Sequence, residues 1–138
     1  MDYKLAKGIT IAATIQAAVI GTIVLYSCGS QAADTWTDKQ VNLGITWGVL
    51  QTIDYSQTLY IAKRPKQYYE KESSRYIGEH PSTNRVTNHF IVTTGIKLAI
   101  MHYLPSEYRT MFQYVNIVYT GNIVYQNYRI GIGLDIPF

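Results

Sequence analysis

The sequence has 138 residues but contains only one cysteine, Cys28. A single cysteine excludes a disulfide bond within the chain. The three histidines stand at positions 80, 89 and 102, far from Cys28, so a zinc site built from cysteine and histidine is not expected. We predict neither a bound metal nor a cofactor.

Charged residues are also scarce, at 15% of the chain against roughly 25% in typical globular domains. The formal net charge is +3, and no segment shows a dense basic face. These features argue against nucleic acid as a partner and favour contact with anionic lipid. The 13 tyrosines point the same way, because tyrosine is enriched where a membrane meets water.

Familiar catalytic motifs are absent as well. No serine lies in a G-x-S-x-G turn. Gly131 and Gly133 do not form a nucleotide-binding fingerprint, because no strand–turn–helix pattern follows them. The sequence therefore gives no support to nucleophilic catalysis.

The N-terminal segment has the layout of a secretory signal or a signal anchor. Two lysines precede an uncharged run from Ile9 to Tyr26. The sequence Leu-Tyr-Ser-Cys at 25–28 resembles a bacterial lipobox, which implies cleavage before Cys28 and attachment of lipid to it. The alternative is an uncleaved membrane helix with an incidental cysteine. We assign 1–27 to a signal peptide or signal-anchor helix and 28–37 to a polar tether.

The remaining residues, 38–138, predict an all-α domain of three helices with a short C-terminal tail that is extended or forms a strand. Thr37 or Asp38 is suited to cap the first helix, and Pro65 stops it. Ser82 or Thr83 opens the second helix, and Ser106 caps the third. The expected helix bounds are about 38–63, 83–104 and 106–128. Along the third helix, one side carries Tyr108, Phe112, Val115, Tyr119 and Asn122.

Two interpretations of these helices stay open: they span a membrane, or they form a bundle that is tethered to it. The first two helices are apolar around most of their circumference, as are helices buried in a large protein or in lipid. A chain of this length is too short to bury three such helices completely. If every helix crossed, the basic loop at 63–85 and Arg129 would lie on one side, as the positive-inside bias requires. Arg109 would then snorkel outward from the start of the third helix.

Asp54 is the most informative single residue. On a helix it shares a face with Trp47, Leu50 and Ile61, so the acid interrupts an apolar stripe. An ionised carboxylate in such a place is costly unless it is paired or hydrogen-bonded. Asp54 therefore either meets a structural partner or handles protons or a ligand, as acids inside membranes often do.

Other polar residues interrupt the apolar stretches. Gln57 lies one turn after Asp54, and Lys97 lies past the middle of the second helix. If the helices pack antiparallel, an Asp54–Lys97 ion pair is the simplest way to satisfy both charges. Asn116 and Asn122 are expected to donate hydrogen bonds between helices.

The loop before the second helix holds the remaining candidate residues. Gly78 permits a tight backbone turn, and Pro81 makes the entry into the helix rigid. His80 and His89 could approach each other with a glutamate nearby, which would give an acid–base group. A helix-capping turn is the simpler interpretation. The loop motif comprises Glu70, Gly78, Glu79, His80 and Pro81.

The segment from about Trp47 to Phe90 resembles a family of small uncharacterised bacterial and bacteriophage membrane proteins. In that family an Asp-x-x-Gln-Thr helix, here at 54–58, leads to Tyr-Tyr-Glu, here at 68–70, and then to Gly-x-His-Pro, here at 78–81. The family tends to carry Asn-Pro where this chain has Glu-Ser-Ser at 72–74. The resemblance implies a membrane protein with several helices and makes a phage or prophage origin plausible, but it implies no activity.

These observations favour a non-enzymatic membrane protein or lipoprotein of the bacterial envelope. We expect it in the inner membrane, with an outer-membrane lipoprotein as the alternative. It would act on a lipid bilayer, on a host envelope protein or by self-association, for example in superinfection exclusion or lysis. The competing hypothesis is a small membrane enzyme or a proton-coupled element that uses Asp54, His80 and His89.

Overall fold

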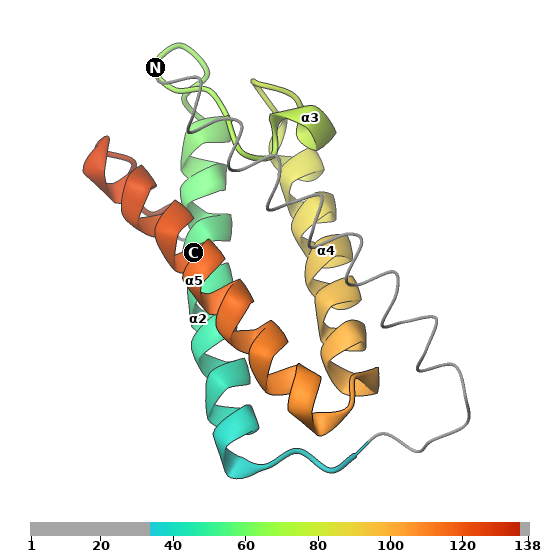
Figure 1. Cartoon of the computed structure of the whole chain (residues 1–138). Helices are drawn as coiled ribbons and strands as arrows, with labels where there is room; N and C mark the ends of the chain where they lie inside the picture. Colours follow the sequence, from blue (N-terminus) through green and yellow to red (C-terminus); the bar gives the residue numbers. More distant parts are fainter. Residues whose placement is uncertain (1–33, 136–138) are drawn as a thin grey trace, which may run out of the picture.

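A computed structural model describes residues 34–135 (Figure 1). Three long helices are present, namely α2 (Asp38–Ala62), α4 (Thr83–Tyr103) and α5 (Ser106–Arg129), and the loop after α2 contains the single turn α3 (Ser74–Ile77). The described residues are all-helical and contain no strand. The long helices begin at the expected residues and end within one residue of the expected bounds. The sequence did not predict α3.

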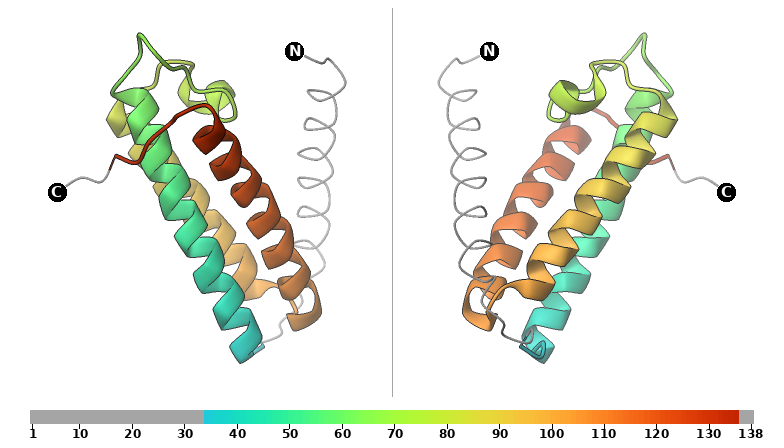
Figure 2. Two further views of the ribbon diagram at one scale, coloured as in Figure 1. Left: turned by 90° about the vertical axis from the view of Figure 1, so that its left-hand side faces the viewer. Right: turned by 90° about the vertical axis from the view of Figure 1, so that its right-hand side faces the viewer.

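The polypeptide runs along α2, returns along α4 and runs forward again along α5, so α2 and α5 are parallel (Figures 1 and 2). α5 packs closely on α2, whereas α4 and α5 diverge from the turn that joins them. A compact apolar cluster closes the end of the bundle near α3. Its members are Leu59, Ile77, Val86 and Phe90, with Tyr55 packed against them.

Capping explains where α2 begins. The Thr37 hydroxyl accepts a hydrogen bond from the Gln40 N–H at 3.3 Å, and the Gln40 side chain accepts one from the Thr37 N–H at 3.2 Å. This reciprocal pair satisfies two N–H groups that the first turn leaves unpaired. Ser82 caps α4 in the simpler way, by accepting from the Arg85 N–H.

The expected cap of α5 is wrong. Pro105 is the residue before the helix, and its own side chain makes no capping hydrogen bond. Ser106 is instead the first helical residue, and its hydroxyl accepts a hydrogen bond from Gln40 Nε2 at 2.9 Å. Proline favours this position because its fixed φ suits a helix entry. The serine is thereby free to join α5 to the start of α2.

Arg109 is fully buried, so the expectation that it snorkels outward is wrong. Its Nε donates to the Met101 carbonyl at 2.7 Å, and its Nη2 donates to the Leu104 carbonyl at 2.9 Å. These carbonyls belong to the C-terminal end of α4, where helix carbonyls lack partners and carry partial negative charge. Nη1 donates to Gln40 Oε1 at 3.1 Å, so a single side chain joins the ends of α4, α5 and α2.

The last residues of the expected tether, 34–37, lie against the bundle rather than free of it. The Asp34 carbonyl accepts from Arg109 Nη2 at 3.1 Å, and the Asp34 carboxylate accepts from the Ser106 N–H at 3.2 Å. The ring of Trp36 lies 5.3 Å from the Arg109 guanidinium. The proposed signal or anchor segment, 1–27, and Cys28 lie outside the described residues.

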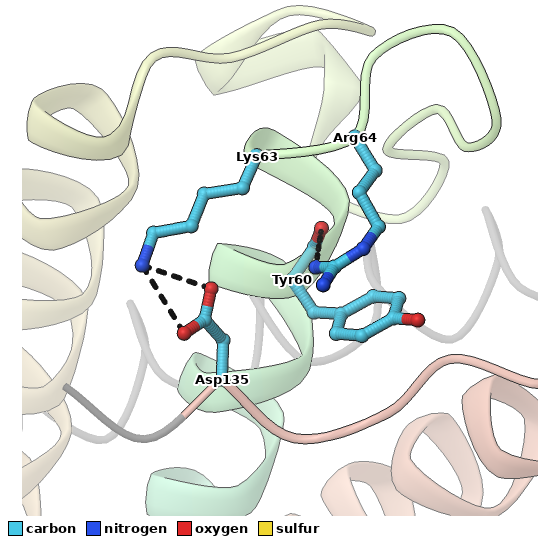
Figure 3. Close-up of polar contacts among 4 residues, drawn as sticks. All are labelled: Tyr60, Lys63, Arg64 and Asp135. Atoms are coloured by element: carbon cyan, nitrogen blue, oxygen red, sulfur yellow. Dashed lines mark hydrogen bonds and ion pairs between the residues drawn. The ribbon is translucent and has the colours of Figure 1, made fainter.

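The C-terminal tail beyond α5 is extended as far as it is described. It turns at Gly131, which has a φ of 81°, and crosses α2 (Figure 2). Ile132 is buried, and Asp135 forms an ion pair with Lys63 at 3.0 Å (Figure 3). The Asp135 N–H also donates to the Ser56 carbonyl at 3.4 Å. These contacts fix the tail along the C-terminal half of α2.

The side chains are distributed inversely to those of a typical water-soluble bundle. Among residues 34–135, ten polar or charged side chains are buried, against nine apolar ones. Twenty large apolar or tyrosine side chains are exposed in the same range. The outer face of α4 alone exposes Ile91, Val92, Ile96 and Leu98. Within that range, no helix is both long enough and apolar enough to be a candidate membrane span.

We predict that Arg109→Gln destabilises the fold by about 3 kcal/mol or more, because it leaves buried carbonyls at the end of α4 unpaired. Arg109→Lys should also be destabilising, since an ammonium cannot reproduce the planar donor pattern. Urea unfolding followed by circular dichroism measures the change. Arg129→Gln, at an exposed site on the same helix, is the control and should change stability by less than about 0.5 kcal/mol. Equal stability of Arg109→Gln and the parent chain would contradict the role given to this residue.

Candidate functional site

The interior between α2 and α5 is polar along most of its length. We call this region the polar seam. On α2 it comprises Gln40, Trp47, Gln51, Asp54 and Gln57, and on α5 it comprises Arg109, Gln113, Asn116, Thr120 and Asn127. The two helices keep one register throughout, because Gln40 bonds Thr110, Leu50 lies beside Gly121, and Gln57 bonds Asn127. Polar groups at equivalent depths of the two helices therefore face one another.

The side of α5 that carries the aromatic and apolar residues noted in the sequence does not face α2. The apolar side of this helix is largely exposed, including Tyr108, Val115 and Tyr119. The buried side carries Arg109, Gln113, Asn116 and Thr120 instead. The signal was available, because these four recur at steps of four, three and four, which is the spacing of the inner positions in paired helices. The usual tendency of apolar residues to face inward points to the opposite side of this helix.

The first part of the seam is fully hydrogen-bonded around Gln40. This side chain donates to the Ser106 carbonyl at 2.8 Å and to the Thr110 hydroxyl at 3.0 Å. Gln113 Nε2 donates to the Gln40 carbonyl at 2.8 Å. Such side-chain-to-backbone bonds between helices specify the register of α5 on α2. None of these three contacts was anticipated from the sequence.

The middle of the seam contains polar atoms that are buried but have no hydrogen-bond partner in the described part of the chain. They are Trp47 Nε1, Gln51 Oε1, Gln113 Oε1 and Asn116 Oδ1. A buried polar atom without a partner costs roughly 1–3 kcal/mol. Such atoms are rare in packed cores, so they mark this region as a candidate site.

Asp54 lies on α2 beside this region and is half-buried. Burial is the largest cause that raises its pKa from 3.8 to about 7, and the negative charges of Glu70 and Glu72 add to the rise. Lys97 opposes it. Within residues 34–135, no hydrogen bond or ion pair reaches the Asp54 carboxylate. A carboxyl group in this setting exchanges its proton near neutral pH.

The expected ion pair between Asp54 and Lys97 is not formed. The Lys97 ammonium lies 5.8 Å from the centre of the Trp47 ring, on the α2 side of α4. Burial lowers the pKa of Lys97, and the charge of Asp54 partly offsets this effect. The two groups therefore influence each other through space without direct contact. Lys97 is half-buried on the side of α4 that faces Trp47.

The other expected polar residues differ in burial and in their hydrogen-bond partners. Gln57 is buried, donates to the Val124 carbonyl at 3.3 Å and accepts from Asn127 Nδ2 at 3.1 Å. Asn116 is buried, but its amide donates to the Phe112 carbonyl of its own helix, so the predicted bond between helices is wrong. Asn122 is exposed and does not belong to the polar interior. Asn127 takes the role expected of Asn122.

The loop motif forms a folded turn in which Glu70 is buried. The Glu70 N–H donates to the Glu79 carbonyl at 2.7 Å, and Glu70 Oε1 accepts from the Ser73 N–H at 2.9 Å. Burial raises the pKa of Glu70, while the Ser73 N–H acts in the opposite direction. Gly78 has a φ of 87°, a backbone conformation that residues with a side chain rarely adopt. The chain continues from this turn to the buried Pro81.

The structure does not assemble the proposed acid–base group. His80 and Glu79 are exposed, whereas His89 is half-buried and stacks on Tyr76 with ring centres 5.9 Å apart. Burial lowers the pKa of His89, and Lys97 lowers it further. No described contact joins the two histidines to each other or to Asp54. The residues from 34 to 135 also contain no cluster of three or more groups suited to hold a metal ion.

Comparison of the whole chain with protein-family profiles, with curated proteins and with solved structures finds no match in any of the three. The arrangement itself supports proton exchange at Asp54 and binding by surfaces and grooves. Among residues 34–135, no hydrogen bond joins a side-chain hydroxyl to a histidine or carboxylate base, which is the pair that covalent catalysis uses.

We predict that Asp54→Asn stabilises the protein increasingly as the pH rises from about 4 to 7, with no further gain above 7. The raised pKa means that the folded state binds a proton more tightly than the unfolded state, so ionisation costs stability across this window. The full pKa difference, which already includes the attraction to Lys97, sets an upper limit of roughly 4 kcal/mol on the gain at pH 8.

Chemical unfolding at pH 4, 6 and 8 measures this effect. Asp38→Asn, an exposed acid on the same helix, controls for the removal of one negative charge. A difference between Asp54→Asn and the parent chain that is the same at all three pH values would contradict the prediction.

Proposed function

We propose that this protein is a non-enzymatic protein of the bacterial envelope, of phage or prophage origin, that lies at a membrane and binds a host membrane component. Receptor masking, superinfection exclusion and participation in lysis are activities of this kind. The proposal rests on the surface of the bundle, its charge distribution and the lack of a catalytic group in the described residues.

The exposed apolar surface is the observation that carries the proposal. Ile91 is 66% exposed, Val92 57% and Ile96 54%, and all three lie on α4 away from the interior. α2 adds Val41, Ile45 and Val49 to the apolar surface. Apolar side chains exposed in this number are costly in water, and apolar surface of this kind marks contact with lipid or with a partner. The buried polar seam fits the same interpretation, since a bundle surrounded by lipid directs its polar groups inward.

The charges lie mainly at one end of the bundle. The end formed by the loop 63–85, Arg129 at the end of α5 and the chain after it holds seven lysines and arginines against four acids. The opposite end, near the turn between α4 and α5, is acidic apart from Lys39 and the buried Arg109. We call the first region the basic end. Anionic lipid headgroups attract such a region, and the tyrosines around it suit a membrane–water boundary.

Binding is favoured over catalysis because the acid–base candidates do not meet. An enzyme using Asp54, His80 and His89 would need the three groups within reach of one substrate. The resemblance of 47–90 to small bacterial and bacteriophage membrane proteins agrees with a role in binding. A surface of this kind can bind a partner without catalysing a reaction.

Proton coupling through Asp54 is the second candidate. One observation favours it, namely the pKa of about 7 for a carboxyl group in a polar interior. It requires that activity depend steeply on pH and that Asp54→Asn be inactive, whereas the first proposal requires neither.

We predict that the full chain resists extraction from bacterial membranes by carbonate, and that Val92→Asp reduces the membrane-bound fraction several-fold. A charge at a lipid-facing position costs up to roughly 3 kcal/mol, depending on depth. Asn88→Asp is the matched control, because it adds the same charge one turn away at an exposed polar site. Complete release of the parent chain by carbonate, or equal effects of the two variants, would argue against lipid contact through α4.

We also predict that Asp54→Asn, Glu79→Gln and His80→Ala, tested singly, leave the activity mostly intact at equal protein abundance. The plating efficiency of phages on bacteria that express the chain is a suitable measurement. Loss of activity in all three variants would contradict a binding role, and loss in Asp54→Asn alone would favour proton coupling.

A further inference from the structure

A groove of about 710 Å³ runs between α2, α5 and the C-terminal tail. Its walls include Ile53 from α2, Val124 from α5 and Leu134 from the tail. The tail crosses α2 and thus forms one side of the groove (Figure 2). This volume lies within the range of roughly 300–1,000 Å³ that is typical of sites for small molecules.

Glycines shape the groove. Gly121 exposes the α5 backbone, and a side chain added there would lie 3.7 Å from Leu50. At Gly133 an added Cβ would lie 3.0 Å from the Tyr60 ring, so a larger residue there would require this ring to shift. The tail therefore lies close to α2 along one side of the groove.

The groove offers almost no free hydrogen-bonding group along its walls. Its one amide side chain, Gln57, already donates to the Val124 carbonyl and accepts from Asn127. A peptide in this slot would leave its backbone N–H and carbonyl groups unpaired, which is costly. A hydrocarbon chain would incur no such cost.

The mouth of the groove is polar and cationic. Tyr125 and Tyr128 line it with exposed rings, and the Arg129 guanidinium lies 5.9 Å from the centre of the Tyr125 ring. The nearest acid on the tail, Asp135, is paired with Lys63 at 3.0 Å (Figure 3). Arg129 therefore gives the mouth a positive charge that suits a carboxylate.

We propose that this groove binds one long-chain fatty acid, with its hydrocarbon chain between α2, α5 and the tail and its carboxylate beside Arg129. This site lies on the α5 and tail side of the bundle, apart from the outer face of α4. The inference goes beyond the proposed function and does not depend on it.

The experiment is an equilibrium titration of the full chain, held in a lipid-free amphipathic polymer, with a fluorescent C18 fatty acid. We expect saturable binding of one molecule per chain and displacement by oleate. Val124→Trp fills the groove and should weaken binding about tenfold or more, equivalent to at least about 1.4 kcal/mol. Val118→Trp is the matched control, because Val118 is 69% exposed on the same helix and does not line the groove. Its affinity should equal that of the parent chain.

Two further variants keep the test decisive if Val124→Trp does not fold. Leu134→Asp places a charge at an exposed edge of the groove and should also weaken binding about tenfold. Arg129→Gln should weaken displacement by oleate several-fold and leave displacement by the neutral oleyl alcohol unchanged. Lys66→Gln, at an exposed site in the basic end, should change neither.

Several results would overturn the inference: no saturable binding, several molecules bound per chain, equal affinity of the Val124→Trp and Val118→Trp variants, or no effect of Leu134→Asp. Dimerisation through this face, detected as a Val124-dependent change in mass, would also overturn it in favour of a second copy as the occupant. The following pair of variants distinguishes a failure of the proposed function from a failure of this inference. Val92→Asp should lose membrane association but still bind the fatty acid, and Val124→Trp should do the reverse.

Discussion

The fold depends on a buried positive charge that no carboxylate neutralises among the described residues. The Arg109 guanidinium is bound by carbonyl oxygens at the end of α4, by the side chain of Gln40 and by the Asp34 carbonyl. Helix carbonyls are fixed dipoles, so they satisfy the cation only if the three chain segments meet in one geometry. This requirement positions α5 against α2 and sets the register of every polar layer that follows.

A polar seam and an apolar exterior are two consequences of that packing. Once Arg109 faces inward, helical spacing brings Gln113, Asn116 and Thr120 to the same side and turns Val115 and Val118 outward. Side-chain hydrogen bonds from Gln40 and Gln57 therefore join α5 to α2 near both ends of α2. The apolar cluster around Val86 and Phe90 joins α4 to α2 at the end near α3.

The candidate sites follow from where this packing is incomplete. Asp54 lies beside the unpaired polar atoms of the seam, and burial without a direct partner moves its proton exchange towards neutral pH. The groove lies where α5 ends and the tail crosses α2. The glycines at 131 and 133 belong to this part of the tail and line the groove. One site is polar and internal, and the other is apolar and open, so they suit different ligands. Both are formed by α2 and α5.

Local signals in the sequence determined the helices. Capping residues act within a few positions, so Thr37 and Ser82 placed the starts of α2 and α4, and the face of α2 around Trp47 and Asp54 followed from periodicity. Only the tertiary structure decided which side of α5 is buried and that Asp54 and Lys97 do not pair. Those outcomes depend on hydrogen bonds between residues about 70 positions apart, which local patterns do not encode. Polarity alone could not reveal them, because in this bundle the polar stripe of α5, not its apolar stripe, faces its neighbour.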